Sequence, residues 1–264
     1  MPLMLAAIWQ YRGFISGSVQ REFQTRYRNS LLGALWTVLN PLAMILVYTL
    51  VFSSVMGNRL AGHASGFAYS IYLCAGIFTW ALFAEITTRS TNVFIEHANL
   101  IKKLSFPRIC LPVVVVLNAL VNFGIIFGLF IAFLAVSGNL PGWPLAALVP
   151  LLLVEVLFAI GLGMVLGVLN VFFRDVGQAF TIVLQFWFWF TPVVYVATAL
   201  PVEVRGLLSW NPLYGVIAGF QRVLVDGAWP EWSGLLPAAI LGVLLCALGM
   251  RLFRGRVGEM VDEL

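Results

Sequence analysis

The chain has 264 residues, of which 61% are hydrophobic and 10% are charged, and its formal net charge is +4. A soluble domain carries roughly 25% charged residues, so this chain has too few to cover a globular surface in water. Composition therefore excludes an ordinary soluble protein. We predict an all-α integral membrane protein with one transmembrane domain over 1–264.

The N-terminal segment 1–30 is too polar to cross a membrane. It nevertheless carries an apolar stripe, because hydrophobic side chains recur at spacings of three or four residues, and arginines gather at its end. This pattern predicts an amphipathic helix that lies in the cytoplasmic surface of the membrane. The alternative is a helix that packs on a partner domain. The stripe consists of Ile8, Tyr11, Ile15, Val19, Phe23 and Tyr27.

Six segments between 32 and 253 are apolar and long enough to cross a bilayer, which takes about 20 residues. They are 32–56, 67–88, 109–136, 145–171, 178–198 and 233–253. Cationic residues are concentrated on one side of these spans, and the opposite side has Arg59, Arg205 and Arg222. Because cytoplasmic loops carry the excess of Lys and Arg, we predict a multi-pass protein with both termini in the cytoplasm. The cytoplasmic cations are Arg12, Arg21, Arg26, Arg28, Arg89, Lys102, Lys103, Arg108, Arg174, Arg251, Arg254 and Arg256.

The predicted cytoplasmic loop 92–108 combines apolar and charged side chains. Residues 93–104 can form a short helix, which Phe106-Pro107 ends because proline disfavours a helix at the residue before it. A short amphipathic helix between two spans is suited to contact with a cytoplasmic partner, and the alternative is a solvated connector. Arg174-Asp175, in the turn after the fourth span, is either a second contact or a charged turn that fixes topology.

The predicted outer segment 199–232 keeps apolar stretches although it connects two spans. Pro201, Pro212, Gly215 and Gly219 divide it into pieces too short to cross a membrane. Short apolar helices of this kind suit a re-entrant hairpin that is buried in protein.

Charged residues also lie within or beside the predicted spans. Glu155 is far from both ends of the fourth span, where an ionised group costs about 2.5–3.5 kcal/mol. We expect it to face a wet cavity or to bond a polar partner such as Asn118 or Asn122. Glu85 and Arg89 are four residues apart and can pair on one face of a helix.

Several short motifs occur in order along nearly the whole chain. The loop motif follows the pattern N-x-x-L-I-x-K-x-x-F-P-R-x-x-L-P closely, although its spacing is not identical. The matching residues are Arg21-Glu22-Phe23 through Arg26-Tyr27-Arg28, Ser30 to Gly33, Leu35-Trp36, Leu39-Asn40-Pro41, Asn99 (or Asn92), Leu100, Ile101, Lys103, Phe106, Pro107, Arg108, Leu111, Pro112, Phe173-Arg174-Asp175, Phe190-Thr191-Pro192-Val193 and Asn211-Pro212. Together they resemble the polysaccharide-export permeases of ATP-binding-cassette transporters.

This resemblance implies a homodimer in the bacterial inner membrane that binds two copies of a separate ATPase. Its cargo would be a glycan linked to undecaprenyl diphosphate, with the O-antigen of lipopolysaccharide as first choice. The sequence has no G-x-x-x-x-G-K-[ST] phosphate loop, so we expect ATP and Mg²⁺ on the partner, and no cofactor, metal, catalytic residue or nucleic acid for this chain. Alternative cargoes are a capsule polysaccharide, a teichoic acid, a drug or a small lipid. A membrane-embedded glycosyl- or acyltransferase would require clustered Asp, Glu or His at one membrane face, and a passive channel would need no ATPase.

The resemblance also implies roles for individual residues. Contact with the ATPase falls to Asn99, Leu100, Ile101, Lys102, Lys103, Phe106, Pro107, Arg108, Arg174 and Asp175. Aromatic faces stack on sugar rings, so the polysaccharide path would use Trp36, Tyr48, Phe78, Trp80, Trp187 and Trp189, together with Glu155; the alternative for the aromatic residues is an interfacial belt. Guanidinium groups bind phosphate through two hydrogen bonds, so Arg21, Arg26 and Arg28 would hold the lipid diphosphate, unless they serve only topology and attraction to anionic lipids.

Overall fold

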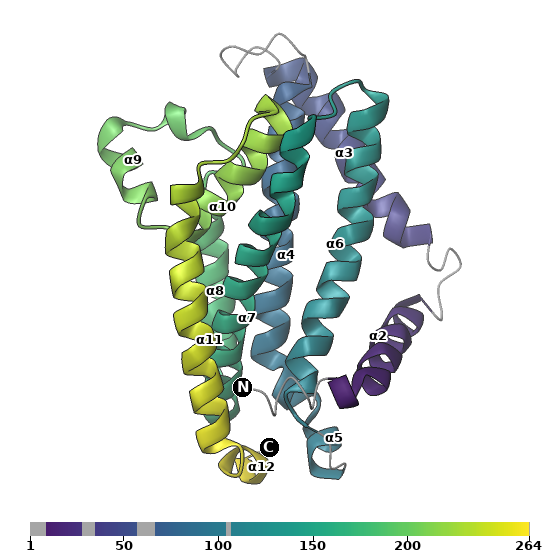
Figure 1. The fold of residues 1–264 in the computed structure, drawn as a ribbon, viewed down its shortest axis with the longest axis vertical. Coiled ribbons are helices and arrows are strands. Elements are labelled where there is room, and N and C mark those ends of the chain that lie inside the picture. Colours follow the sequence, from purple (N-terminus) through teal and green to yellow (C-terminus); the bar gives the residue numbers. More distant parts are fainter. Residues whose placement is uncertain (1–8, 28–34, 57–66, 104–106, 264) are drawn as a thin grey trace.

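The computed structural model describes residues 9–27, 35–56, 67–103 and 107–263, and within them the chain is helical without any β-strand. Four helical segments in this part of the chain are long and apolar enough to cross a membrane. They are Ala68–Glu96 (α4), Cys110–Val136 (α6), Trp143–Phe172, which contains η2 (Trp143–Ala147) and α7 (Leu148–Phe172), and Trp232–Arg256, which contains η5 (Trp232–Leu235) and α11 (Leu236–Arg256). These helices run along the long axis of the molecule (Figure 1).

Two further helices occupy the remaining predicted spans. Helix α3 (Trp36–Met56) contains the apolar stretch Val38–Leu50. Helix α8 (Asp175–Trp189) is shorter than the predicted span 178–198 and ends where Phe190-Thr191-Pro192 begins. Pro192 cannot donate a backbone hydrogen bond and disfavours helix at the residue before it. The predicted bounds 178–198 are therefore wrong for a single helix, and the count of six spans stays a prediction.

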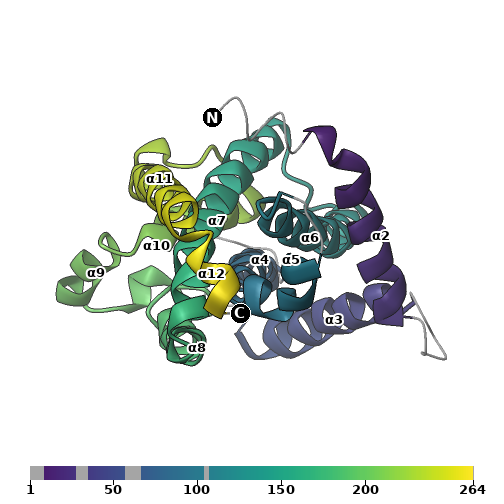
Figure 2. The same ribbon diagram turned by 90° about the horizontal axis from the view of Figure 1, so that it is seen from below.

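Helix α4 forms the centre of the bundle. It contacts α3, α6, α7, α8 and the short helix α10 (Pro212–Gln221), and Figure 2 shows it surrounded by α3, α6, α7 and α8. Helix α7 approaches α4 closely because two glycines face it. A Cβ atom on Gly167 would lie 2.5 Å from the carbonyl oxygen of Ser90, and a Cβ atom on Gly163 would lie 2.5 Å from the Cβ atom of Ser90. Most of α4 is thus enclosed by the chain's own helices.

The N-terminal helix α2 (Arg12–Tyr27) packs against α6. Ile15, in the middle of the predicted apolar stripe, is buried with Cys110 and Val114 at the start of α6, and Tyr11 and Val19 pack against this cluster. Part of the stripe is therefore covered by the same chain. Residues 1–8 and 28–34 lie outside the described part of the chain.

The predicted outer segment 199–232 folds into short pieces at the opposite end from the C-terminus (Figure 1). Helix α9 (Val202–Leu208) is mostly exposed, whereas α10 is largely buried and contacts α4, α7 and α11. The chain continues through a single π-helical turn, η4 (Arg222–Asp226), to η5. The division at Pro201 and Pro212 is confirmed, whereas the predicted breaks at Gly215 and Gly219 are wrong, because both glycines lie inside α10. A re-entrant position in the membrane stays a prediction.

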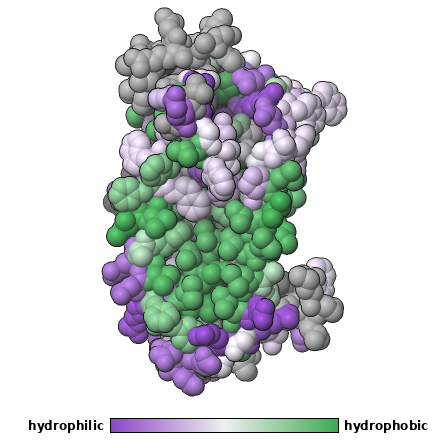
Figure 3. All heavy atoms as spheres, turned by 90° about the vertical axis from the view of Figure 1, so that its left-hand side faces the viewer, coloured by the Kyte–Doolittle hydropathy of each residue, from purple (hydrophilic) through white to green (hydrophobic). Residues whose placement is uncertain are grey.

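The surface has the hydropathy of a protein that spans a bilayer. In Figure 3, a broad hydrophobic band covers the middle of the face that includes α11, and hydrophilic residues gather above and below it. The exposed apolar side chains of α11 include Ile240, Leu241, Val243, Leu244 and Leu248. Because exposed apolar area of this size is unfavourable in water, the band indicates where lipid or another protein covers the chain.

Candidate functional site

The short helix α5 (Ala98–Lys103) lies at the end of the bundle that also holds the C-terminus (Figure 1). It is held on one side, because Ile101 is buried in a cluster that includes Phe94 of α4 and Met260 of α12 (Glu259–Glu263). Its other side chains Asn99, Leu100 and Lys102 are exposed. Helix α5 is shorter than the predicted 93–104 because α4 continues to Glu96 and a turn at His97 separates the two helices.

The residues after α5 lead back into α6. Phe106 lies outside the described residues, and nothing about the side chain of Lys103 is described. Arg108 donates a hydrogen bond from Nη1 to the backbone oxygen of Val257, at a distance of 2.7 Å. This bond joins the start of α6 to the C-terminal segment, and Arg108 is half-buried whereas Lys102 is exposed.

The turn between α7 and α8 exposes Arg174 and Asp175 at the same end of the bundle. Asn170, which is 2% exposed, anchors this turn. Its Oδ1 accepts a hydrogen bond from the backbone N–H of Gly177 at 2.8 Å. Its Nδ2 donates to the backbone oxygen of Thr91 at 3.0 Å and to Oδ1 of Asn92 at 3.2 Å.

Asn170 thereby connects the two exposed elements that the sequence predicts as partner contacts. Thr91 and Asn92 lie near the end of α4, just before α5, and Gly177 lies in the first turn of α8. A Cβ atom on Gly177 would lie 3.0 Å from the Asn170 Oδ1 atom, so the backbone of α8 sits directly against this amide. The two elements therefore share one buried polar joint.

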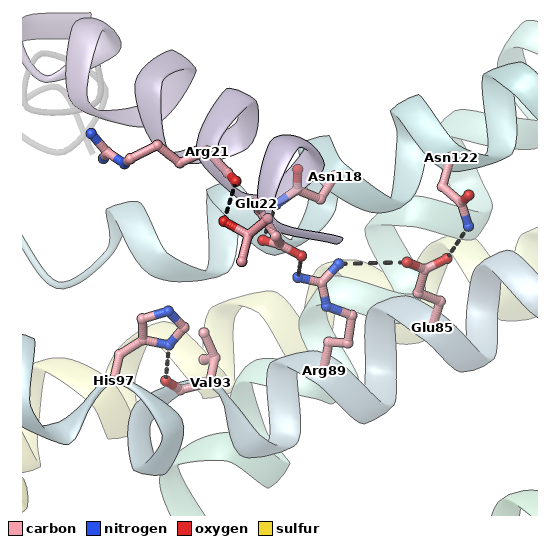
Figure 4. A network of polar contacts seen from close by, with 9 residues as sticks. Arg21, Glu22, Glu85, Arg89, Val93, His97, Asn118 and Asn122 are labelled. Atoms are coloured by element: carbon pink, nitrogen blue, oxygen red, sulfur yellow. Dashed lines mark hydrogen bonds and ion pairs between the residues drawn. The ribbon is translucent and has the colours of Figure 1, made fainter. Parts of the chain in front are cut away.

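A second polar network joins α2, α4 and α6 (Figure 4). Arg89 of α4 forms an ion pair with Glu22 of α2 through Nη2, and a longer one of 3.5 Å with Glu85 through Nη1. Asn118 of α6 donates a hydrogen bond to the second oxygen of Glu22, and Asn122 donates to the second oxygen of Glu85 at 3.0 Å. The predicted Glu85–Arg89 pair is confirmed. Pairing of Glu22 with Arg89 was not visible in the sequence, although the four-residue spacing of both Glu85/Arg89 and Asn118/Asn122 indicates a polar face on each helix.

The cationic residues assigned to a diphosphate lie on or beyond α2. The side chain of Arg21 is exposed, points away from the network in Figure 4 and donates to Ser18 Oγ at 3.0 Å. Arg26 belongs to α2, but nothing about its side chain is described, and Arg28 lies outside the described residues. The Arg21 side chain thus points away from the network that holds Glu22.

The aromatic residues assigned to the polysaccharide path differ in exposure. Trp36 and Trp189 are 50% and 62% exposed, and Tyr48 is partly buried. Phe78 and Trp80 are buried in the core of the chain, where Trp80 packs edge-on against Trp187 with ring centroids 6.4 Å apart. In this conformation, the protein's own side chains therefore cover the rings of Phe78 and Trp80.

A cavity of about 410 Å³ lies beside the end of α8, between this helix and the segment that contains α9. Asn211 organises one wall of it: its Oδ1 accepts from Nε1 of Trp187 at 2.9 Å and caps α10 through the N–H of Leu213, while its Nδ2 donates to Thr191 Oγ1 at 2.8 Å. The sequence motifs around Thr191-Pro192 and Asn211-Pro212 thus contact one another. The cavity is lined by Trp187, Trp189, Phe190, Tyr195, Leu200, Leu207, Leu208 and Asn211.

Glu155 is fully buried in α7, and neither of its carboxyl oxygens has a hydrogen-bond partner among the described residues. The expected partnership with Asn118 or Asn122 is wrong, because those amides bond Glu22 and Glu85 instead. Helical periodicity alone does not determine which faces of two distant spans meet. Among the described residues, no group of three or more His, Cys, Asp or Glu side chains is placed to hold a metal ion.

Comparisons with known proteins agree along most of the chain. A family model described as ABC-2 type transporter matches residues 15–225. The O-antigen export system permease protein RfbA of Myxococcus xanthus is 29% identical over 263 residues, which cover 99% of both chains. RfbA of Klebsiella pneumoniae is 29% identical over 235 residues, or 88% of both chains. The polysialic acid transport protein KpsM of Escherichia coli is 20% identical over 246 residues, which cover 92% of this chain and 93% of its own. The family match extends from α2 to η4 and includes α5 and the Asn170 joint.

Proposed function

The chain belongs to the ABC-2 type transporter family, and we propose that it is the membrane subunit of an ATP-driven exporter of a lipid-linked polysaccharide, with O-antigen as first candidate cargo. One observation carries this proposal: the similarity to a protein named as an O-antigen export permease extends over 99% of both chains. The similarity to a polysialic acid transport protein makes a capsule polysaccharide the second candidate. These relatives support a class of cargo, polysaccharides, and do not identify the individual glycan.

In this proposal, a separate ATPase binds ATP and Mg²⁺, and two copies of this chain pair with two copies of it. The exposed residues Asn99, Leu100 and Lys102 of α5 and the pair Arg174-Asp175 form the docking surface. The Asn170 joint supports this assignment, because it makes the two exposed elements respond together to a partner that closes against them. The distribution of Lys and Arg supports a cytoplasmic position for this end and for both termini. In this assignment, α3 and α8 with the residues after it complete six spans in the inner membrane.

The cargo path is proposed along the exposed aromatic face of α8 and α3. Trp189 and Trp36 offer ring faces to sugars. Trp189 packs edge-on against Phe188, which in turn packs on the buried Trp80. Aromatic faces suit a sliding polymer because they bind many similar rings weakly rather than one hydroxyl pattern tightly. The cationic residues of α2, with Arg21 as the described example, are assigned to the lipid diphosphate on the cytoplasmic side.

Deletion of the gene from its source bacterium tests the proposal. We expect surface polysaccharide to disappear while lipid-linked glycan accumulates on the cytoplasmic side of the inner membrane, and a plasmid copy of the chain to restore export. Unchanged surface polysaccharide would refute an export role. Disappearance of the lipid-linked glycan itself would instead indicate an enzyme of glycan synthesis.

A further inference from the structure

We propose that Glu22 and Arg89 are positioning residues that make α2 move with α4, so that displacement of α5 by the ATPase reaches the interfacial helix. This inference rests on the proposed function, because it assigns a role to the network within ATP-driven export. It concerns Glu22, a residue of the N-terminal motif to which the sequence assigned no chemical role.

The network connects α2, α4 and α6 through individual hydrogen bonds and ion pairs. The two oxygens of Glu22 are divided between Arg89 and Asn118, and the two oxygens of Glu85 between Arg89 and Asn122. Each carboxylate oxygen therefore has a partner, and the single guanidinium holds carboxylates from two different helices. Hydrogen bonds that involve ionised groups are roughly twice as strong as neutral ones and are directional. A shift of α4 would consequently pull on Glu22 rather than slide past it.

Helix α4 is suited to transmit such a shift. It is continuous from Ala68 to Glu96, and the turn at His97 connects it to α5. At 1.5 Å per residue, Arg89 lies about 13 Å along the chain from the start of α5. The Asn170 joint meets α4 between these two points, at Thr91 and Asn92. Motion of α5 that reaches the end of α4 would therefore pass along one continuous helix to Arg89.

The ion pairs of the network are partly buried. The side chains of Arg89, Glu22 and Glu85 are 27%, 39% and 21% exposed. By contrast, the ion pair between Arg222 and Glu231 at the outer end has side chains that are 42% and 75% exposed. Water screens exposed pairs, so they contribute little, whereas partly buried pairs are screened less. The pair of Arg222 and Glu231 is therefore a control for the loss of an exposed ion pair away from the network.

The orientation of α2 shows what the link would move. Glu22 faces the network and its neighbour Arg21 points away from it (Figure 4). Any rotation or displacement of α2 driven through Glu22 thus repositions the cationic face assigned to the lipid diphosphate. The proposed motion would couple ATP hydrolysis by the partner, at one end of α4, to substrate binding at α2.

Charge exchange tests the link. The chain would be reconstituted in vesicles with its partner ATPase and with lipid-linked glycan extracted from the source strain, and glycan export and ATP hydrolysis would be measured in the same sample. We expect E22R to lower glycan exported per ATP hydrolysed by about tenfold, a typical size for coupling between sites. The exchange E22R/R89E restores the opposite charges; it is made together with E85Q, because the new carboxylate at position 89 would otherwise face Glu85. It should recover export to within about twofold of the E85Q chain, as coupled residues do in a double-mutant cycle. E231R, at the outer pair, should leave the ratio unchanged.

A purely structural role for Glu22 would lower export and hydrolysis together, in proportion to assembled complex, and would overturn the inference. Failure of the exchange to restore the ratio would also overturn it.

If E22R does not assemble, E22Q keeps the size of the side chain, and spin labels at Gln20→Cys on α2 and Leu248→Cys on α11 report the motion directly. We expect ATP to change the distance between labels in the unaltered chain and to change it less in E22Q; an equal change refutes the link. A complex with unaltered Glu22 that exports no glycan contradicts the proposed function instead.

Discussion

Replacing Asn170 with alanine tests the joint between α4 and α8 most directly. The side chain is 2% exposed and makes three hydrogen bonds, to the N–H of Gly177 and to oxygens of Thr91 and Asn92. Gly177 lies in the first turn of α8, where backbone N–H groups have no partner within the helix. In the described structure, the amide of Asn170 supplies that partner.

The size of the effect follows from these bonds. A buried donor left without an acceptor costs about 1–3 kcal/mol, and an ordinary hydrogen bond contributes about 0.5–1.5 kcal/mol. The backbone oxygen of Thr91 stays within α4 when Asn170 is replaced, so we expect the loss of this hydrogen bond to lie at the low end of the second range. We expect Asn170→Ala to lower the free energy of unfolding by about 2–4 kcal/mol. Asn170→Leu, which fills the space without the polar atoms, should be destabilising as well, because the N–H of Gly177 remains unpaired.

Unfolding of the purified chain in lipid nanodiscs measures this loss. Asn139→Ala is the control, since the side chain of Asn139 bonds locally to Ser137 in a loop at the other end of the bundle, and we expect it to change stability by less than about 1 kcal/mol. Equal effects at the two asparagines would refute the reasoning. Full stability of Asn170→Leu would show that volume, rather than hydrogen bonding, accounts for the joint.

Two further substitutions address the two ends of the molecule. Gly215→Ala should prevent α10 from packing, because its Cβ atom would lie 1.8 Å from the carbonyl oxygen of Gly234; we expect a loss of at least about 3 kcal/mol in thermal unfolding, and Gly206→Ala, with open space around it, to be silent. Leu100→Asp should weaken binding of the ATPase in a pull-down titration by about tenfold, as loss of an apolar interface contact does. Leu207→Asp, an exposed leucine at the other end, should bind normally, and a similar loss there would argue against α5 as the docking site.

The long spans could be predicted from the sequence because uninterrupted apolar runs have few other solutions. The predicted 109–136 and 233–253 correspond to Cys110–Val136 and Trp232–Arg256. The predicted 67–88 stopped too early, since α4 continues to Glu96 through polar residues. The polar groups there are tolerated because they form hydrogen bonds with distant parts of the chain: Arg89 donates to Glu22, and the backbone oxygen of Thr91 accepts from Asn170.

The candidate site could be predicted only in part. The short helix before Phe106-Pro107 and the exposed turn at Arg174-Asp175 follow from local composition and breaker residues. A helix displays a run of aromatic residues on all sides, so the sequence did not distinguish exposed Trp189 from Trp187, which packs inward on Trp80. Contacts between side chains tens of residues apart depend on how the helices are rotated against each other, which periodicity does not specify.

Transport in a purified system tests the central claim most directly. The chain and its partner ATPase would be reconstituted in vesicles whose cytoplasmic leaflet carries lipid-linked glycan from the source strain, and a membrane-impermeant glycosidase would report glycan on the opposite side. We predict that glycan appears there only when both proteins and ATP are present. Appearance without the ATPase, or none with the complete system, would contradict the account.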